Sequence, residues 1–398
     1  MKRLIFVDDE PRVLQGLQRQ LHGMRHEWQM TFVESGPKAL EFLAANSVDV
    51  VVSDMKMPLM DGAQLLTEVM KLHPNCVRIV LSGQADRESV LRLVGPAHQY
   101  LSKPCVAEEL RTAINRAFAL RDLLTNQQLK QIATRVRTLP TLPTLHAQLA
   151  EDLRKDDPSM ERIGDIVARD IGMATKILQL VNSAFFGLSH PVSSTHEAVM
   201  YLGLATVRAL VLSLQVFAQY EQKQVKGFSI DALARHSWQV SVFARRIAEA
   251  EHCDAKMDDQ SFLAGLLHDL GQLILAAGVP DDYARVIENA RTRQQTIWEA
   301  EQAEFGATHA EVGAYLLGLW GLPNPVIEAV ALHHRPGDAT ASGFSPVTAV
   351  HVANALAHDL ESTHPEWPGN QVHAAHLERL HLTQRVAVWR ERCLRDYL

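Results

Sequence analysis

The sequence predicts a two-domain protein in which an α/β domain, a five-stranded doubly wound parallel sheet, precedes an all-α helical domain. At 398 residues, the chain exceeds what one hydrophobic core usually organises. Up to about residue 120, short apolar runs rich in Val and Ile alternate with segments of helical period. From Leu139 onward, helix-period segments follow one another with Gly or Pro between them, and no alternating strand pattern is evident.

The strands of the first domain are expected at its short apolar runs. These runs cover residues 4–7, 30–33, 48–53, 77–82 and 99–102. Helical spacing between the first two runs is kept by Val13, Leu14, Leu17 and Leu21. Pro11 precedes these residues in a position suited to the first turn of a helix. Parallel strands joined by crossover helices are therefore the economical interpretation.

Composition indicates a globular protein and disfavours several classes. Hydrophobic residues make up 47% of the chain and charged residues 21%, which leaves enough apolar material for buried cores. The net charge of -7, with Lys and Arg scattered, disfavours a dominant attraction to nucleic acid or anionic lipid. No signal segment or long unbroken apolar stretch is apparent, so we expect a cytoplasmic protein without a membrane partner. The four cysteines have no close-pair spacing, which predicts reduced thiols.

The change of pattern suggests where the domains begin and end. We expect a first domain at 1–120, a helical linker at 121–137, a helical domain at 138–340 and a C-terminal helical extension packed on it at 341–398. Apolar residues at heptad-like spacing follow Pro104, namely Leu110, Ala113, Ala117, Leu120 and Leu124. This segment either links the domains or pairs two chains, and its first half can equally be the last helix of the sheet domain.

Polar residues stand where the predicted strands end. Those after the first, third, fourth and fifth strands are Asp8 and Asp9, Asp54, Ser82 and Lys103. Ligands of doubly wound sheets bind at the carboxyl ends of the strands, so these side chains are expected to converge. Three carboxylates in one place repel one another unless a cation neutralises them, and oxygen donors suit Mg²⁺. Asp54 is then the candidate nucleophile toward a phosphoryl group, with Lys103 and Ser82 holding its oxygens.

Four motifs at these strand ends resemble the receiver domains of response regulators. They are Val7-Asp8-Asp9-Glu10, Asp54 with Met57-Pro58 and Met60-Asp61-Gly62, Leu81-Ser82-Gly83, and Tyr100-Leu101-Ser102-Lys103-Pro104. The roles that the resemblance implies are phosphoacceptor for Asp54, Mg²⁺ ligands for Asp8, Asp9, Asp54 and the Lys56 backbone carbonyl, switch hydroxyl for Ser82, and reorienting aromatic for Tyr100. It also implies a cis bond between Lys103 and Pro104, and a sensor histidine kinase as phosphodonor.

The helical domain resembles the HDOD family, a signalling branch of the HD phosphohydrolase superfamily. The resemblance spans roughly residues 138–340. Its motifs are Leu139-Pro140-Thr141-Leu142-Pro143, Ile166 to Asp170, Leu180-Val181-Asn182-Ser183-Ala184-Phe185-Phe186-Gly187, Ser193-Ser194 through Ala198, Leu202-Gly203-Leu204, and His268-Asp269-Leu270-Gly271. The Asn-Ser-Ala-Phe-Phe-Gly segment is the most specific of them. The resemblance implies an output module generally regarded as non-catalytic or uncharacterised.

Several histidines of this domain occupy positions that resemble those of metal-binding HD proteins. The candidate ligands are His236, His268, Asp269, His309, His333 and His334. Imidazoles with a carboxylate can hold a transition metal such as Mn, Fe or Zn and lower the pKa of its bound water. Two departures count against hydrolysis: Asn354 stands where metal-binding relatives carry a final aspartate, and Gln272 where cyclic-di-GMP phosphodiesterases usually have lysine. A Gly-Tyr-Pro segment after His334 is also missing.

Three interpretations of the histidine set stay open: a hydrogen-bonded structural core, metal binding without efficient hydrolysis, and phosphohydrolase activity. The preferred hypothesis is a phosphorylation-controlled switch in which phosphoryl-Asp54 alters a protein contact or a homodimer through the helical domain. The downstream partner is an unidentified protein. The alternative is a receiver-gated metal-dependent phosphohydrolase acting on a cyclic dinucleotide or nucleotide. Direct DNA binding is not expected, because no basic recognition helix is apparent.

Overall fold

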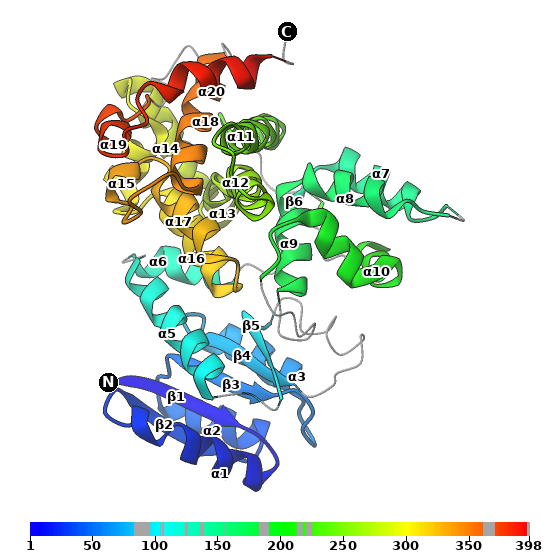
Figure 1. Cartoon of the computed structure of the whole chain (residues 1–398). Coiled ribbons are helices and arrows are strands. Elements are labelled where there is room, and N and C mark those ends of the chain that lie inside the picture. The colour runs from blue at the N-terminus through cyan, green and yellow to red at the C-terminus, as the bar shows by residue number, and fades with distance from the viewer. Residues whose placement is uncertain are drawn as a thin grey trace.

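The computed structural model has a sheet domain at one end and a larger helical domain at the other (Figure 1). It describes residues 1–82, 96–103, 105, 107–123, 126–135, 139–155, 157–182, 191–212, 218–219, 225–360 and 371–395. The expected cis bond before Pro104 and the whole segment Ser183 to Gly187 lie outside the described residues.

The N-terminal domain is built on the predicted five-stranded parallel sheet, with strand order β2-β1-β3-β4-β5. The strands are β1 (Lys2–Val7), β2 (Trp28–Val33), β3 (Val50–Asp54), β4 (Val77–Ser82) and β5 (Gln99–Ser102). Pairing on both sides of β1 and β3 makes those strands central, which explains their unbroken apolar runs. The doubly wound prediction is therefore confirmed, with β1 and β2 beginning two residues earlier and β3 two residues later than their apolar runs.

Helices cover both faces of the sheet because alternate strand residues point to opposite sides. The helices are α1 (Pro11–Gln20), α2 (Gly36–Ala45), α3 (Gly62–Leu72) and α5 (Ala107–Leu123). Leu4 and Phe6 pack in one core with α1 and α5, and Ile5 and Val7 pack in a second core with α2 and α3. This two-sided burial aligns the carboxyl ends of the strands at one edge.

The helical segment after Pro104 divides into two helices. α5 belongs to the sheet domain, because Leu110 and Ala113 are buried in the core beneath the sheet. The first half of the heptad-like seam is therefore the last helix of that domain. A short helix, α6 (Gln127–Arg135), follows and packs against the helical domain.

The second domain is almost entirely helical. Its helices are α7 (Pro143–Asp152), α8 (Met160–Ala168), α9 (Ile171–Val181), α10 (Thr195–Leu212), α11 (Ile230–Ala250), α12 (Ala255–Leu267), α13 (Leu270–Gly278), α14 (Pro280–Arg293), α15 (Ile297–Phe305), α16 (His309–Leu319), α17 (Asn324–Leu332), α18 (Pro346–Leu360), α19 (Ala374–Arg379) and α20 (Arg385–Leu394). A short 3-10 turn, η3 (Pro336–Asp338), lies in this domain, and another, η1 (His22–Met24), lies in the N-terminal domain. A two-residue parallel pair, β6 (Pro140–Thr141) with β7 (Ala218–Gln219), is too short for a sequence pattern to indicate.

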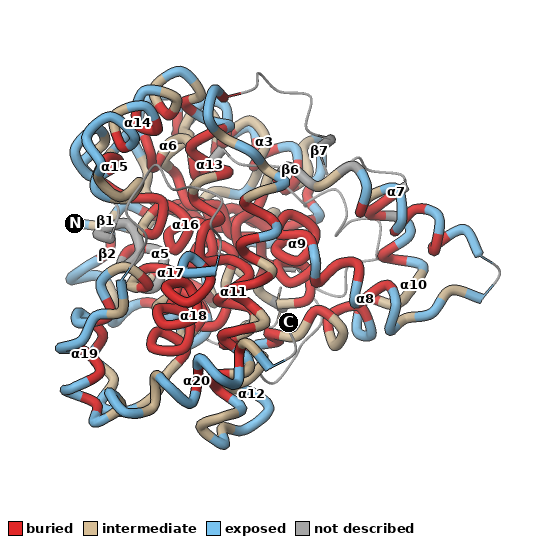
Figure 2. The backbone as a smooth tube through the Cα atoms, turned by 90° about the horizontal axis from the view of Figure 1, so that it is seen from above, coloured by how far each residue is buried: buried red, intermediate tan, exposed pale blue. Residues whose placement is uncertain are grey.

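The tube is buried along most of α9, α11 and α16 to α18, while α7, α8 and α10 form a narrower projecting lobe (Figure 2). Among the described residues, one stretch, Ala255–Gly278 across α12 and α13, is long and apolar enough to cross a bilayer by length and composition alone. Of its most apolar window, 78% is buried inside the structure. That burial is the pattern of a core helix pair.

Candidate functional site

The phosphoacceptor candidate Asp54 is the last residue of β3 and lies at the carboxyl edge of the sheet, 7% exposed. The chain turns back over it, because Gly62 donates its backbone N–H to the carbonyl of Met55 at 2.9 Å. A Cβ at Gly62 would come within 2.2 Å of the Asp54 carbonyl oxygen, so the turn requires glycine. Asp61 then caps α3 through a reciprocal capping box with Gln64.

Three of the predicted residues converge at this edge. Lys103 Nζ lies 2.6 Å from Asp8 Oδ2 and also binds Asp54 Oδ1. The other carboxylate oxygen of Asp54 accepts the backbone N–H of Lys56 at 2.9 Å. Asp8 is 2% exposed, and its Oδ1 accepts the backbone N–H of Glu10 at 3.0 Å. One ammonium therefore binds two buried carboxylates that lie at the ends of different strands.

Burial and charge oppose each other in this pocket. Burial raises the pKa of Asp54, and the hydrogen bond and charge of Lys103 only partly offset that effect. Burial by itself lowers the pKa of Lys103, but its bonds to Asp54 and Asp8 outweigh this and the net pKa is raised. The lysine therefore stays charged at neutral pH. A cationic group beside a carboxylate nucleophile is the arrangement that phosphoryl transfer requires.

The remaining predicted residues border the same edge. Asp9 is half-buried directly after Asp8, and Ser82 ends β4 next to Leu81, which pairs with Asp54. Tyr100 pairs with Val80 and is buried within the core on the α2 and α3 side, where burial raises its pKa. The reorientation expected of Tyr100 stays a prediction, as does the coordination of Mg²⁺ by the Lys56 carbonyl.

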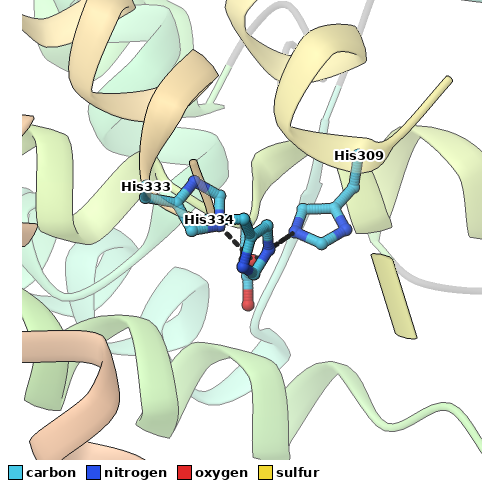
Figure 3. Close-up of side chains that lie close together, drawn as sticks. His309, His333 and His334 are labelled. Carbon is cyan, nitrogen blue, oxygen red and sulfur yellow. Dashed lines mark hydrogen bonds and ion pairs between the residues drawn. The ribbon is translucent and has the colours of Figure 1, made fainter. Parts of the chain in front are cut away.

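The second candidate site is a cluster of histidines at the centre of the helical domain. Its members come from the starts or ends of different helices and from the middle of α11. They are His236 (α11), His268 and Asp269 (between α12 and α13), His309 (first residue of α16), and His333 and His334 (after α17). Figure 3 shows the rings of His309, His333 and His334 turned toward one another. The fold thus brings together all six candidate ligands, although up to 98 residues of sequence separate them.

His268 and His333 share one hydrogen-bonding pattern. Nδ1 of His268 lies 2.7 Å from the Gly265 carbonyl, and Nδ1 of His333 lies 2.8 Å from the Val330 carbonyl. A carbonyl only accepts, so each Nδ1 carries a proton, and the strongly lowered pKa of His333, caused mainly by burial, leaves that ring neutral with a lone pair on Nε2. Both Nε2 atoms are buried without a hydrogen-bond partner. Backbone fixation of one ring nitrogen with the other left open is typical of metal-binding histidines.

Asp269 lies between these rings. Its Oδ1 is 3.0 Å from His309 Nε2 and 3.8 Å from His333 Nε2, while its Oδ2 is 3.3 Å from His268 Nε2. Burial would raise the pKa of Asp269, but the neighbouring imidazoles hold it well below its usual range. Asp269 is therefore an ionised carboxylate at the centre of the cluster.

A carboxylate that the sequence did not reveal supports His309 from behind. Glu301 in α15 is 0% exposed, and its Oε2 lies 2.6 Å from His309 Nδ1 and accepts the His309 backbone N–H at 2.8 Å. The hydroxyl of Tyr283 donates to the other oxygen at 3.1 Å. Burial opposes protonation of His309, but Glu301 and Asp269 outweigh it and raise its pKa to about 10. No motif marks Glu301; only its burial in a helix otherwise lined with exposed glutamates distinguishes it.

The rim of the cluster is formed by His334 and His236. His334 Nε2 lies 2.9 Å from His309 Nε2, and its ring stacks on Trp298. His236 Nε2 lies 3.0 Å from Asn354 Oδ1, so this amide is a hydrogen-bond partner of a candidate ligand. A neutral amide oxygen contributes less to cation binding than a carboxylate would.

The donor atoms fit a metal ion. Asp269, His309, His333 and His334 each offer one ligand atom, and these atoms all lie within 4.8 Å of one another. His236, His268 and Asp269 form a second such group that shares the aspartate. Most of these side chains are buried, and His268 and His309 are 0% exposed. Nitrogen and oxygen donors in a closed site suit a structurally held transition metal better than an open catalytic one.

Comparisons with known proteins assign each domain. A family model described as "Response regulator receiver domain" matches residues 4–115, and one described as "HDOD domain" matches residues 139–336. An uncharacterised protein of Treponema pallidum is 27% identical over 267 residues, which is 65% of this chain and 50% of that protein. The hydrogenase transcriptional regulatory protein HoxA of Cupriavidus necator is 34% identical over 116 residues, 29% of this chain and 23% of that protein. The chain thus spans half or less of the length of these relatives.

Among solved structures, the MmoQ response regulator from Methylococcus capsulatus superposes with a TM-score of 0.50 at 23% identity, covering 65% of this chain and 98% of that one. At this identity, the likeness concerns the fold alone. A parallel sheet with an acidic edge, joined to a helical domain, defines a two-domain signalling protein of the two-component type. The chain belongs to the response regulators in which a receiver domain is followed by an HDOD domain.

Proposed function

We propose that this response regulator accepts a phosphoryl group on Asp54 and uses it to control protein contacts of its HDOD domain. The observation that carries the proposal is the convergence of Asp54, Asp8 and Lys103 at the carboxyl edge of the sheet. A buried carboxylate at the end of β3, paired with a charged lysine, is a nucleophile beside a cation that neutralises incoming oxygens. A sensor histidine kinase is the expected phosphodonor.

The pocket and the phosphodonor supply the groups that the phosphoryl transfer needs. An Asp54 carboxylate oxygen attacks phosphorus and forms an acyl phosphate, while the phosphorus–nitrogen bond of a phosphohistidine breaks. The leaving imidazole keeps the electron pair and takes up a proton from water. Lys103 and the Ser82 hydroxyl are proposed to hold the transferred oxygens, and Tyr100 to reorient with Ser82.

The acidic edge fits a magnesium ion by its donor chemistry. The residues that would hold it are Asp8, Asp9 and Asp54 with the backbone carbonyl of Lys56. When bound, Mg²⁺ supplies positive charge that lets carboxylate and phosphoryl oxygens approach one another. Lys103 binds both Asp8 and Asp54, so the pocket holds one lysine for two carboxylates, and for three once Asp9 is counted.

The output is proposed to be a changed contact with another protein or a changed homodimer, in the cytoplasm and without DNA binding. The relatives whose names identify transcriptional regulators match only 28–29% of this chain, a span the size of the receiver. Their likeness therefore reaches only the receiver and carries no DNA-binding role to the helical domain. The acidic surplus of charge points the same way.

The central test is phosphorylation of the purified full-length chain by acetyl phosphate and Mg²⁺, followed by intact-mass measurement and size-exclusion chromatography. We expect a mass increase of one phosphoryl group, loss of that increase in Asp54→Asn, and a changed elution volume or partner capture that also requires Asp54. Asp281→Asn, which alters an exposed aspartate of α14, is the matched control and should behave as the unaltered chain. Phosphate-dependent changes that persist in Asp54→Asn would contradict the proposal.

A second proposed property of the helical domain is metal binding at the histidine cluster. The Nε2 atom of His333 favours it, because it is buried without a hydrogen bond to any described residue, and a buried lone pair without a partner is costly unless something binds there. We expect purified protein to retain Mn, Fe or Zn in elemental analysis and His268→Ala to lose most of it. Metal contents equal in the two proteins would contradict this assignment.

The rival activity, phosphohydrolysis of a cyclic dinucleotide or nucleotide, needs substrate access to the metal ligands. The closed placement of His268 and His309 and the replacement by Asn354 favour binding over turnover. Incubation of the Mn²⁺-loaded protein with cyclic-di-GMP and nucleotide phosphates decides between them. Turnover that His309→Ala abolishes would establish the rival.

A further inference from the structure

A buried arginine joins the receiver sheet to α6, the helix between the domains. Arg78 lies in β4 and is 0% exposed. Its guanidinium donates to the backbone carbonyls of Cys76 at 3.1 Å, Pro96 at 2.5 Å and Thr134 at 2.8 Å. A buried guanidinium stays charged and needs acceptors for its donors. Because Thr134 belongs to α6, one of these acceptors comes from outside the receiver domain.

His98, which immediately precedes β5, takes part in the same contact. Its Nδ1 accepts the backbone N–H of Arg78 at 3.0 Å, and its Nε2 lies 3.3 Å from the Thr134 carbonyl. Burial and the charge of Arg78 lower the pKa of His98 well below its usual range, so the ring is neutral. The same Nε2 lies 2.9 Å from Nη2 of Arg78, so the imidazole, the guanidinium and the Thr134 carbonyl meet at one place. Two receiver strands therefore bind the same carbonyl of α6.

The strand β5 connects this contact to the phosphoacceptor. His98 precedes β5, and Lys103, which binds Asp54, follows it. β5 is a short edge strand that pairs only with β4. A phosphoryl group on Asp54 adds negative charge within reach of Lys103, so a displacement of that lysine acts directly on β5, the strand that begins after His98.

The helix α16 connects the same region to the histidine cluster. α6 and α5 both pack against α16. Gln99 in β5 reaches the Gly318 carbonyl near the end of α16 at 3.5 Å, and Asn126 donates to the Phe305 carbonyl just before its start at 2.6 Å. His309, the first residue of α16, is a member of the cluster. One helix thus has one end against the receiver and the other in the candidate metal site.

We propose that Arg78, His98 and the Thr134 carbonyl form a latch through which the phosphorylation state of Asp54 controls α16 and the histidine cluster. The proposal rests on phosphorylation of Asp54 and specifies how that event reaches the helical domain. Its distinguishing claim is that the route runs through β5 and α6, so removing the arginine donors uncouples the domains without touching the phosphoacceptor.

Hydrogen exchange of the full-length chain, read by mass spectrometry, tests the latch. Without phosphodonor, Arg78→Met should raise exchange at least several-fold in α6 and in the first turn of α16. With acetyl phosphate and Mg²⁺, exchange in α16 should change in the unaltered chain and not in Arg78→Met, although both gain a phosphoryl group. Gln29→Ala, which alters an exposed glutamine on the opposite edge strand β2, is the matched control and should keep the full response.

Gln99→Ala provides a milder variant if Arg78→Met unfolds the receiver, which would appear as lost protection in β1 and β3. It removes only the direct contact of β5 with α16, and a reduced α16 response supports the latch. An unaltered chain that gains the phosphoryl group while α16 and α6 keep their exchange rates overturns the latch and leaves the proposed function standing. A chain that gains no phosphoryl group overturns both.

Discussion

At the residue scale, the turn after the phosphoacceptor depends on the absence of a side chain at Gly62. An added Cβ would meet the Asp54 carbonyl oxygen at 2.2 Å, and a strand backbone cannot give way as a flexible side chain can. We expect Gly62→Ala to destabilise the receiver by about 1–3 kcal/mol, the usual cost of overpacking. Hydrogen exchange of β3 and α3 measures this separately from the helical domain.

Gly16 is the matched control for that substitution. It lies inside α1, and a Cβ there would have nothing within 4 Å. Gly16→Ala should therefore leave the receiver intact and stabilise α1 by roughly 0.5–1 kcal/mol through helix propensity. Equal protection of β3 in the two variants would show that the turn tolerates a methyl group.

A second residue-scale feature is the buried lysine of α9. Lys176 is 1% exposed, with Gln179 Oε1 at 3.2 Å and the Trp320 ring at 4.2 Å, and burial lowers its pKa to about 7. A lysine whose pKa is lower folded than unfolded binds fewer protons when folded. Its destabilising effect is therefore full below pH 7 and fades as pH rises toward 10.5, the ordinary value.

Lys176→Met should consequently stabilise the helical domain, on the order of 3–5 kcal/mol at pH 6.5, by the conversion of about 1.4 kcal/mol per pKa unit. The difference from the unaltered chain should shrink steadily from pH 7 to pH 10. Urea unfolding at several pH values measures it. A difference that stays constant over this range would mean that the amine titrates normally.

At the element scale, the sequence predicted those features that repeat with a period or sit at a strand end. The apolar runs placed all five strands, and the polar residues that follow them lie together because parallel strands end at one edge. Arg78 was included in an apolar run, since one charged residue does not break a period of hydrophobic residues. Its burial depends on Thr134, a residue 56 positions away, and no local pattern encodes such a contact.

The candidate metal cluster also contains residues that the sequence reveals and one that it does not. His268 and Asp269 were recognisable as a pair inside an apolar helical stretch, where ionisable groups need partners. Glu301 was not, because its role depends on how α15 packs beside α16 rather than on any neighbour in sequence. Helix packing decides which of many glutamates becomes buried, and that information is tertiary.

The helix α20 packs on the helical domain through a buried tryptophan. Trp389 is 0% exposed, and its Nε1–H donates to Glu251 at 2.8 Å, beside Arg385, which binds the same carboxylate at 2.7 Å. We expect Trp389→Ala to release α20 from α11, at a cost of about 3–5 kcal/mol for a buried aromatic. Limited proteolysis should then cut between α18 and α20 first. Val388→Ala, at a 43% exposed neighbour, should leave the cutting pattern unchanged.

At the scale of the whole molecule, the two candidate sites are linked by α16, which contacts β5 of the receiver and contributes His309 to the cluster. A helix of this length is stiff, so a displacement of one end tilts or translates the other end as well. Coupling of binding free energies is reciprocal: if occupancy of the receiver changes metal affinity, metal must change receiver affinity by the same factor.

That reciprocity gives a prediction about the intact protein. We expect beryllofluoride, a phosphoryl mimic that binds at Asp54 with Mg²⁺, to change Zn²⁺ affinity of the histidine cluster by roughly 5- to 150-fold, the usual range of coupling. Titration of Zn²⁺ with and without beryllofluoride, and of beryllofluoride with and without Zn²⁺, should return the same factor. Arg78→Met should bring both factors toward one, because each ligand still binds while the route between them is cut. Two unequal factors would violate linkage and reveal Zn²⁺ bound at a second place, and equal factors of one in the unaltered chain would mean that the two sites act independently.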